Sequence, residues 1–118
     1  MELTENLGQN PELDSSFKLE LVRSDDGSIT IESDGKIELI AKALSSETRR
    51  LILQQIQLNN NGMDVSNIAA NLNMTEANIS AQIKKLEEAG LIDCIYCSGN
   101  HGVRKISKLK YSQINIKF

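Results

Sequence analysis

The stretch "DVSNIAANLNMTEANISAQIKKLEEAGLI", residues 64–92, decides the fold because it holds two short helical patterns with almost nothing between them. The first pattern follows Asp64, a residue type that caps helix N-termini well. Its apolar residues then recur at intervals of three and four, at Val65, Ile68, Ala69 and Leu72. This spacing predicts one amphipathic helix, with its apolar stripe turned toward a core.

The second pattern begins after a link of only two residues, Asn73 and Met74. Thr75 can cap this helix. Its inward positions are Ile79, Ile83 and Leu86. Gly90 then tolerates the left-handed backbone that ends many helices. Two short helices joined so tightly must cross steeply, which predicts a helix-turn-helix whose second helix spans residues 75–89.

Upstream of this stretch, the sequence predicts a hairpin followed by two more helices. Apolar residues alternate in "FKLELVR" and in "ITIES", on either side of a turn at Gly27, which is typical of two antiparallel strands. From Ile37 the apolar residues return at helical intervals, and a second helical run covers about residues 47–58. Residues 17–36 are therefore expected to form a β-hairpin and a linker.

Downstream, "LIDCIYC" and "VRKISKLKY" flank the turn "SGNHG" and predict a second hairpin. The last run, "INIKF", is an apolar strand that could pair with the N-terminal hairpin. The fold expected is therefore α+β and mainly α. Residues 1–16 are polar and acidic and contain the only proline, so they are expected to be a disordered tail.

The net charge of -3 is unevenly distributed along the 118 residues. Residues 1–36 hold three Lys or Arg against nine Asp or Glu, whereas residues 37–118 hold ten against seven. The segment from Gly99 to Lys110 contains four cations and no acid. The acidic balance of the whole chain therefore does not exclude a nucleic-acid partner for its second part.

Several functional classes find no support in the sequence. No apolar run approaches the roughly 18 residues of a membrane span, and the N-terminus lacks the basic start of a secretory signal, so a cytoplasmic protein is predicted. The single His lies in a Gly-flanked turn, and there is neither a phosphate-binding loop nor an evident carboxylate pair. We therefore expect no enzymatic activity and no cofactor.

The open side of helix 75–89 carries side chains suited to DNA. If the apolar stripe faces the core, helical spacing places five other residues on the opposite, exposed side. These are Ala77, Asn78, Ala81, Gln82 and Lys85. Asn and Gln amides can pair with adenine in the major groove, Ala can touch a thymine methyl, and Lys can reach guanine or a phosphate. Thr75 lies at the helix N-terminus, which can hold a phosphate. The alternative is that these side chains only form a solvated surface of the helix. The tight turn before the helix and the basic hairpin after it favour a contact with DNA.

The second hairpin predicts a further DNA contact. Its tip and its following strand carry Asn100, His101, Arg104 and Lys105. Cations of this kind are attracted to a narrow minor groove or to the phosphate backbone. A charged run is often only a solvated surface, but this one directly follows the predicted reading helix.

Cys94, Cys97 and His101 have the spacing C-x2-C-x3-H, which raises the possibility of a zinc site. Residues three apart in a strand point to opposite faces, however, and a fourth ligand is missing. We therefore expect free thiols and no metal.

Taken together, "IAKALSSETRRLIL", "VSNIAANLNMTEANISAQIKKLEEAGLI" and "GNHGVRKI" resemble the ArsR-type winged helix-turn-helix transcriptional regulators over about residues 37–110. The resemblance implies a winged helix-turn-helix DNA-binding domain with a two-stranded wing, which we expect to span residues 37–118. The N-terminal β-hairpin expected from the alternating pattern is additional to it. It implies a dimeric regulator of double-stranded DNA that represses. Helix 75–89 would read the major groove, and the wing, residues 98–105, would contact the backbone or the minor groove.

The same resemblance assigns base- and phosphate-reading positions to Ala77, Asn78, Ser80, Ala81 and Gln82. Gln82 stands where many members have His, and Asn73 stands where Gly is usual in the turn. The segment "DVSNIAANL" lacks the Cys pair of the metal-sensing members. The chain also ends in a strand where a dimerising helix is common. A homodimer could therefore associate through the helix that begins near Ile37, the N-terminal hairpin or "INIKF".

Two rival interpretations remain open at this point. The reading face could dock a protein instead of a DNA groove, which would make the chain an assembly module. The acidic N-terminal segment could also fold over the basic wing and mimic DNA.

Overall fold

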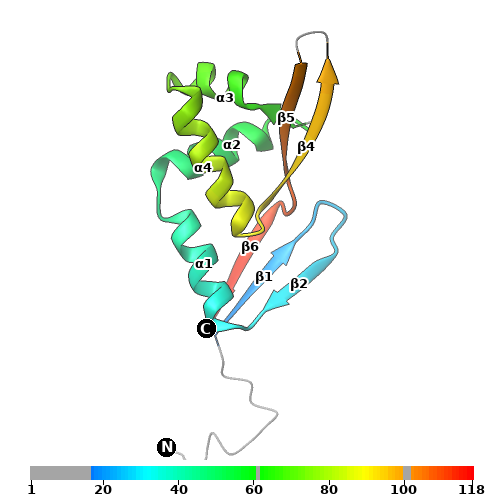
Figure 1. Cartoon of the computed structure of the whole chain (residues 1–118). Coiled ribbons are helices and arrows are strands. Elements are labelled where there is room, and N and C mark those ends of the chain that lie inside the picture. The colour runs from blue at the N-terminus through cyan, green and yellow to red at the C-terminus, as the bar shows by residue number, and fades with distance from the viewer. Residues whose placement is uncertain (1–16, 61, 100–101) are drawn as a thin grey trace, which may run out of the picture.

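The computed structural model describes residues 17–118 except 61, 100 and 101, so the expected tail and the wing-tip residues Asn100 and His101 lie outside the described residues. Within the described residues, four helices form the body of the protein, and two sheets lie at opposite ends of it (Figure 1). In chain order the elements are β1 (Lys18–Val22), β2 (Ser28–Ile31), α1 (Asp34–Leu44), α2 (Glu47–Gln57), β3 (Met63–Asp64), α3 (Val65–Leu72), α4 (Glu76–Glu88), β4 (Ile92–Gly99), β5 (Gly102–Leu109) and β6 (Gln113–Lys117).

Each of the four helices begins at a capping side chain. The side-chain oxygen of each capping residue accepts a hydrogen bond from the backbone N–H three residues later. This bond satisfies an N–H group that has no partner within the first turn. The capping residues are Ser33, Ser46, Asp64 and Thr75. Because Ser33 caps α1, this helix begins at Asp34, earlier than the apolar repeat that starts at Ile37.

The turn between α3 and α4 has the geometry expected from the sequence. Asn73 caps the end of α3 in the left-handed conformation, with φ 55° and ψ 48°. Asn tolerates this backbone better than most residues. Gly90 follows α4 with φ 77°, so the helix ends where the sequence predicts.

The wing hairpin gains a third strand at its base. Strands β4 and β5 pair antiparallel from Ile92↔Leu109 to Gly99↔Gly102, and β3 adds to the other side of β5, with Met63 opposite Ser107. The sequence predicted only the two long strands. The extra strand is two residues long and is fixed by pairing with a segment more than forty residues away, so no local pattern indicates it.

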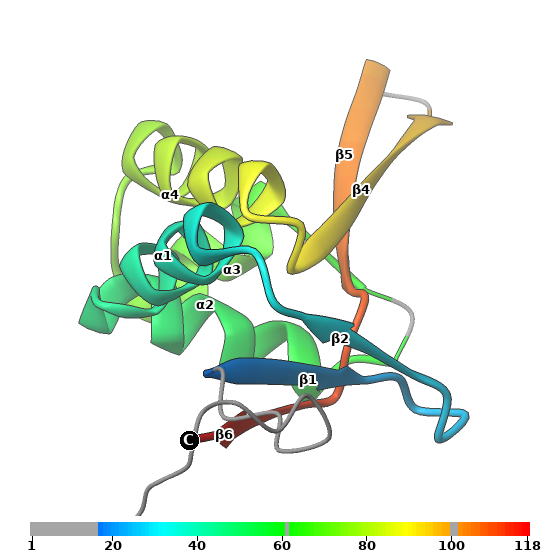
Figure 2. The same cartoon turned by 90° about the horizontal axis from the view of Figure 1, so that it is seen from below.

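The second sheet joins the two ends of the described chain. Its order is β2–β1–β6, so the last strand pairs with the N-terminal hairpin, as the sequence suggested. Leu19 lies opposite both Ile31 and Ile116, and the rings of Phe17 and Phe118 meet edge to face at 5.5 Å. Seen from below, the three strands lie on one side of the helices while the wing rises on another (Figure 2).

The core is a single aliphatic cluster that runs from the N-terminal sheet through the helices to the base of the wing. Its fully buried apolar side chains are Ile52, Ile68, Ile79, Ile83, Leu86 and Ile92. Each contributes about 1.5–3 kcal/mol relative to exposure. Aromatic residues make up only 3% of the chain, so Ile and Leu carry this packing.

Candidate nucleic-acid interface

Helix α4 has one buried side and one open side, as its sequence predicts. Ile79, Ile83 and Leu86 are fully buried. The side chains exposed elsewhere on the helix or at its cap include Thr75, Ala77, Asn78, Ser80, Ala81 and Lys85. The Thr75 hydroxyl accepts a hydrogen bond from the Asn78 N–H at 3.1 Å, which fixes the first turn.

Gln82 is only half exposed, because its amide is held between two other side chains. Its oxygen accepts a hydrogen bond from Nη1 of Arg49 at 2.8 Å. Its nitrogen donates to Oδ1 of Asn78 at 3.1 Å. The two amides of the predicted reading face are therefore linked to each other and to α2.

Arg49 is a residue that the sequence analysis missed. Its Nε donates to the carbonyl of Ala43 at 2.7 Å, and its Nη2 donates to that of Lys42 at 2.8 Å. These carbonyls belong to the last turn of α1, where backbone acceptors lack partners within the helix. Arg49 lies in the quoted segment "ALSSETRRLIL", but its contact with Gln82 spans 33 residues, so no local spacing indicates it.

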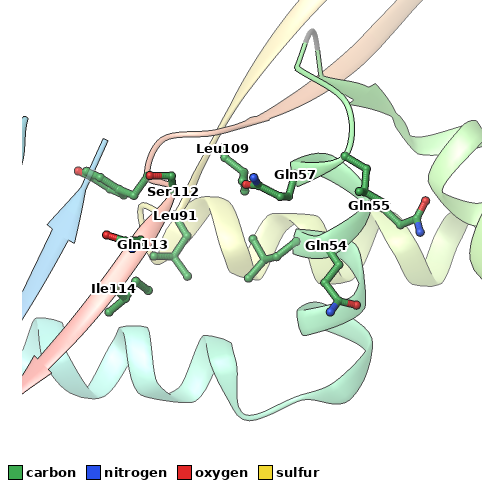
Figure 3. Close-up of a pocket in the computed structure, with 11 residues that line it drawn as sticks. Gln54, Gln55, Gln57, Leu91, Leu109, Ser112, Gln113 and Ile114 are labelled. Carbon is green, nitrogen blue, oxygen red and sulfur yellow. The ribbon is translucent and has the colours of Figure 1, made fainter. Parts of the chain in front are cut away.

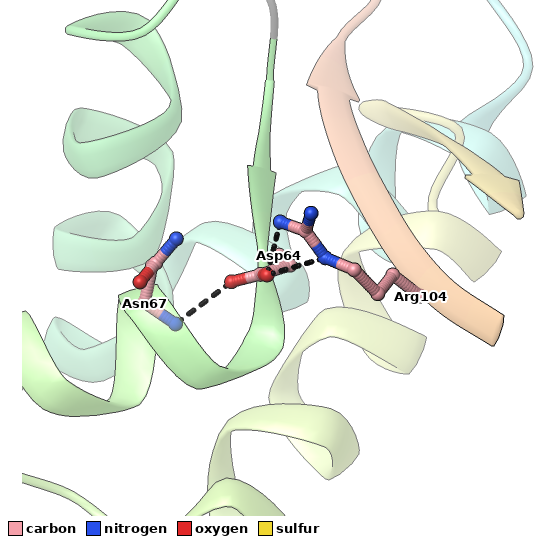
Figure 4. Close-up of polar contacts among 3 residues, drawn as sticks. All are labelled: Asp64, Asn67 and Arg104. Atoms are coloured by element: carbon pink, nitrogen blue, oxygen red, sulfur yellow. Dashed lines mark hydrogen bonds and ion pairs between the residues drawn. The ribbon is translucent and has the colours of Figure 1, made fainter. Parts of the chain in front are cut away.

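The wing residue Arg104 is paired with Asp64 (Figure 4). One oxygen of Asp64 accepts hydrogen bonds from Nε and Nη2 of Arg104, and the other accepts the Asn67 N–H at 2.8 Å. Burial acts to raise the pKa of Asp64, but the hydrogen bond from Asn67 and the Arg104 guanidinium outweigh it and hold that pKa below its ordinary value. The Arg104 side chain remains 57% exposed.

Lys105, the next predicted wing residue, lies near α4. Its Nζ is 3.4 Å from Oε1 of Glu87, so it forms a long and partly exposed ion pair. Such pairs contribute little stability and exchange partners easily. Asn100 and His101 were predicted for the same interface but lie outside the described residues.

The two cysteines are free and differ in exposure. Cys97 is exposed, whereas Cys94 is half-buried with its Sγ 3.7 Å from Oγ of the buried Ser107. Burial raises the pKa of the Cys94 thiol above its ordinary value. Within the part of the chain that the structure describes, no three His, Cys, Asp or Glu side chains gather in a way that could hold a metal ion.

A hollow lies away from these residues. It has a volume of about 630 Å³ and opens between α2 and the segment that joins β5 to β6 (Figure 3). Its lining is mainly apolar with glutamines at α2, and it includes Leu53, Gln54, Leu91, Leu109 and Ile114. Of the residues predicted to contact DNA, none that the structure describes lines it. No helix in the described ranges is long and apolar enough to cross a membrane.

Comparisons with known proteins agree with this geometry. Residues 46–93, from the cap of α2 to the start of β4, match the family model described as bacterial regulatory protein, arsR family. Five chains of known structure match the fold, including the crystal structure of the AntR antimony-specific transcriptional repressor. That likeness has a TM-score of 0.55 and 20% sequence identity and covers 88% of this chain and 80% of the other. No curated protein matches the sequence.

Proposed function

We propose that the chain is a DNA-binding transcriptional regulator that reads the major groove with α4 and contacts the adjacent backbone or minor groove with its wing. The match of residues 46–93 to the arsR family model supports this proposal. One observation carries this proposal. The polar side of α4 lies opposite the buried Ile79, Ile83 and Leu86, and the helix leads directly into the basic hairpin β4–β5.

The proposed roles on α4 follow from side-chain chemistry. The two small residues Ala77 and Ala81 allow the helix to approach the bases closely. Asn78 and Gln82 supply amides for the base edges, and Lys85 can reach guanine or a phosphate. The capped N-terminus at Thr75, with Ser80 nearby, is suited to phosphate contacts because its backbone N–H groups and helix dipole favour an anion.

The wing supplies the proposed second contact. Arg104 and Lys105 lie on β5, and the turn residues Asn100 and His101 are proposed to reach the same stretch of DNA. Lys105 pairs with the exposed carboxylate of Glu87, which a DNA phosphate can replace at small cost because surface ion pairs are weak. Arg104 pairs with the largely buried Asp64, but its own side chain is 57% exposed, so its guanidinium can contact a phosphate while it keeps that partner. Contacts to phosphates position the protein, while the contacts of α4 specify sequence.

We further propose a homodimer that acts as a repressor in the cytoplasm, bound to half-sites about one helical turn apart. Strand β6 supports a contact between copies, because it lies at the edge of its sheet. Ile116 on this strand is 57% exposed, and Phe118 just after it is 95% exposed. An unpaired edge with exposed apolar residues is suited to antiparallel pairing with a second copy.

Fluorescence anisotropy tests the proposed reading helix. The protein is titrated against a duplex from its own upstream region and a scrambled duplex, each at two salt concentrations. Gln82→Ala should weaken binding to the preferred duplex by about 1–3 kcal/mol and leave the scrambled duplex nearly unaffected. Gln54→Ala, which removes an exposed glutamine of α2, is the matched control. Equal loss on both duplexes would contradict base reading by Gln82.

A further inference from the structure

We propose that Arg49 is a positioning residue that determines which bases α4 prefers, by fixing the orientation of the Gln82 and Asn78 amides. This inference rests on the proposed function, because it concerns how the reading helix is prepared for DNA. Arg49 belongs to α2 and need not touch a base itself. It would act through the hydrogen bond from its Nη1 to the amide oxygen of Gln82.

The chemistry of the guanidinium fixes the direction of the Gln82 amide. Arg has only hydrogen-bond donors, so the group that faces it must be the amide oxygen of Gln82 and not its nitrogen. The Gln82 nitrogen then donates to Oδ1 of Asn78 at 3.1 Å. Arg49 thus orients the Gln82 amide directly. Gln82 in turn orients the Asn78 amide, whose nitrogen also donates to Sδ of Met74 at 3.8 Å.

Arg49 can impose this order because α1 holds it in place. Two further N–H groups of its guanidinium donate to the carbonyls of Lys42 and Ala43, at 2.8 Å and 2.7 Å. All three contacts use the rigid fork of the guanidinium, which loses little entropy for each bond formed. The Gln82 amide is therefore already ordered before DNA binds. Preorganisation of this kind reduces the entropy lost on binding.

The arrangement also changes the base expected beneath these amides. The Gln82 oxygen is engaged by Arg49, and the Asn78 oxygen is engaged by Gln82. Each oxygen keeps a second lone pair but faces its partner on the protein, so the groups free to turn toward a base are N–H donors. Paired recognition of adenine requires an acceptor that faces the base as well. Guanine presents two acceptors in the major groove, N7 and O6. Arg49 therefore favours guanine at this position of the site.

The experiment compares two neighbouring arginines. Arg49→Lys keeps a cation at the end of α1 but removes the fork that reaches Gln82. Arg50→Lys is the matched control, because Arg50 donates to the carbonyl of Leu44 at 2.8 Å and has no described contact with α4. Selection from randomised duplexes is carried out with four variants. These are Arg49→Lys, Arg50→Lys, Gln82→Ala and the double variant that combines Arg49→Lys with Gln82→Ala. The affinity ratio between the selected and scrambled duplexes is then measured.

Arg49→Lys should lower this ratio by roughly five- to 150-fold, the range expected for one well-oriented base contact. The guanine preference should disappear at the same base position as in Gln82→Ala, and the double variant should lose no more than Gln82→Ala alone. Arg50→Lys should keep the ratio. An unchanged ratio in Arg49→Lys, an equal loss in Arg50→Lys, or additive losses in the double variant would overturn the proposal.

A measurement without DNA separates this proposal from the proposed function. The side-chain amide signal of Gln82, observed by NMR in the free protein, should report an ordered group in the native protein and in Arg50→Lys. It should report a rotationally averaged group in Arg49→Lys. An amide that is equally mobile in all three would overturn the role of Arg49. An ordered amide in a protein that shows no preference among duplexes would overturn base reading and leave the orientation by Arg49 standing.

Discussion

The Asp64 carboxylate ties the wing to the helix-turn-helix, because one of its oxygens binds Arg104 on β5 while the other caps α3 through the Asn67 N–H. Arg104 is 40 residues away in the sequence. A single carboxylate therefore sets both the start of α3 and the position of the wing base relative to it. Its protonation should loosen both contacts together.

The first prediction concerns acid stability. Because folding lowers the pKa of Asp64, its contribution is complete above the ordinary value of 3.8 and is lost as pH falls through the lower value of the folded state. Asp64→Asn keeps a good capping residue but removes this charge. The variant should lose less stability than the native protein on going from neutral to strongly acid solution. Urea unfolding at several pH values measures the free energy of unfolding of each protein. Arg104→Gln should remove only part of the pH dependence that Asp64→Asn removes.

The second prediction compares two glycines with left-handed backbone, Gly62 at φ 87° and Gly90 at φ 77°. A Cβ on Gly90 would meet no atom within 4 Å, so Gly90→Ala should cost only the backbone strain, about 1–2 kcal/mol. A Cβ on Gly62 would lie 2.7 Å from Cγ2 of Ile106 and 2.7 Å from the Ser107 carbonyl oxygen. Gly62→Ala should cost about 1–3 kcal/mol more, because the buried wing base must shift. Equal losses in denaturant unfolding would contradict this close packing.

The third prediction tests the wing as a phosphate contact. Lys105→Ala should weaken binding to all duplexes and reduce the slope of log affinity against log salt by about 1. Lys117→Ala is the control, because Lys117 also forms an ion pair, at 3.7 Å with Glu20, but lies on β6 in the other sheet. A salt slope that stays the same in Lys105→Ala, or falls equally in both variants, would count against the wing contact.

The fourth prediction concerns thiol reactivity. Near neutral pH, iodoacetamide should modify Cys97 first, because it is exposed, and Cys94 later. Cys94 is partly covered, and its raised pKa reduces the thiolate fraction that reacts. Mass spectrometry after timed alkylation measures both rates. Faster modification of Cys94 would show that the contact with Ser107 opens readily.

The fifth prediction distinguishes the possible contacts between copies. Ile116→Lys, on β6, should shift the protein from dimer to monomer, because it places a charge on the exposed sheet edge. Leu39→Lys is the comparison, since Leu39 is 45% exposed on α1, the other candidate surface. Sedimentation velocity over a range of concentrations reports the mass of each variant. If Leu39→Lys were monomeric and Ile116→Lys remained dimeric, the interface would lie on α1 and not on β6.

Local patterns were enough to predict the helix-turn-helix. Thr75, Asn73 and Gly90 each have a conformational preference that decides a helix end. The buried stripe on α4 follows directly from helical spacing, because a helix that packs on a core must turn its apolar residues inward. The start of α1 was less evident, since the capping residue Ser33 precedes a polar first turn that contains Gly35.

Contacts between distant segments could not be predicted in this way. Strand β3 exists because Met63 pairs with Ser107, and the ion pair of Asp64 with Arg104 depends on that pairing. Gln82 was correctly placed on the polar side of α4, but its amide is oriented by Arg49 from another helix. The orientation of a polar side chain depends on its partners, and these are known only once the elements have packed.

The pairing of β1 with β6 also sets an order of assembly during synthesis. Leu19 emerges from the ribosome long before Ile116, the residue it lies opposite. The helices and the wing lie between these strands in the sequence, so the pairing of β1 with β6 closes a long loop, whereas β1 and β2 are joined by a short turn. The hairpin β1–β2 can therefore form early, and the addition of β6 is expected to come late in folding.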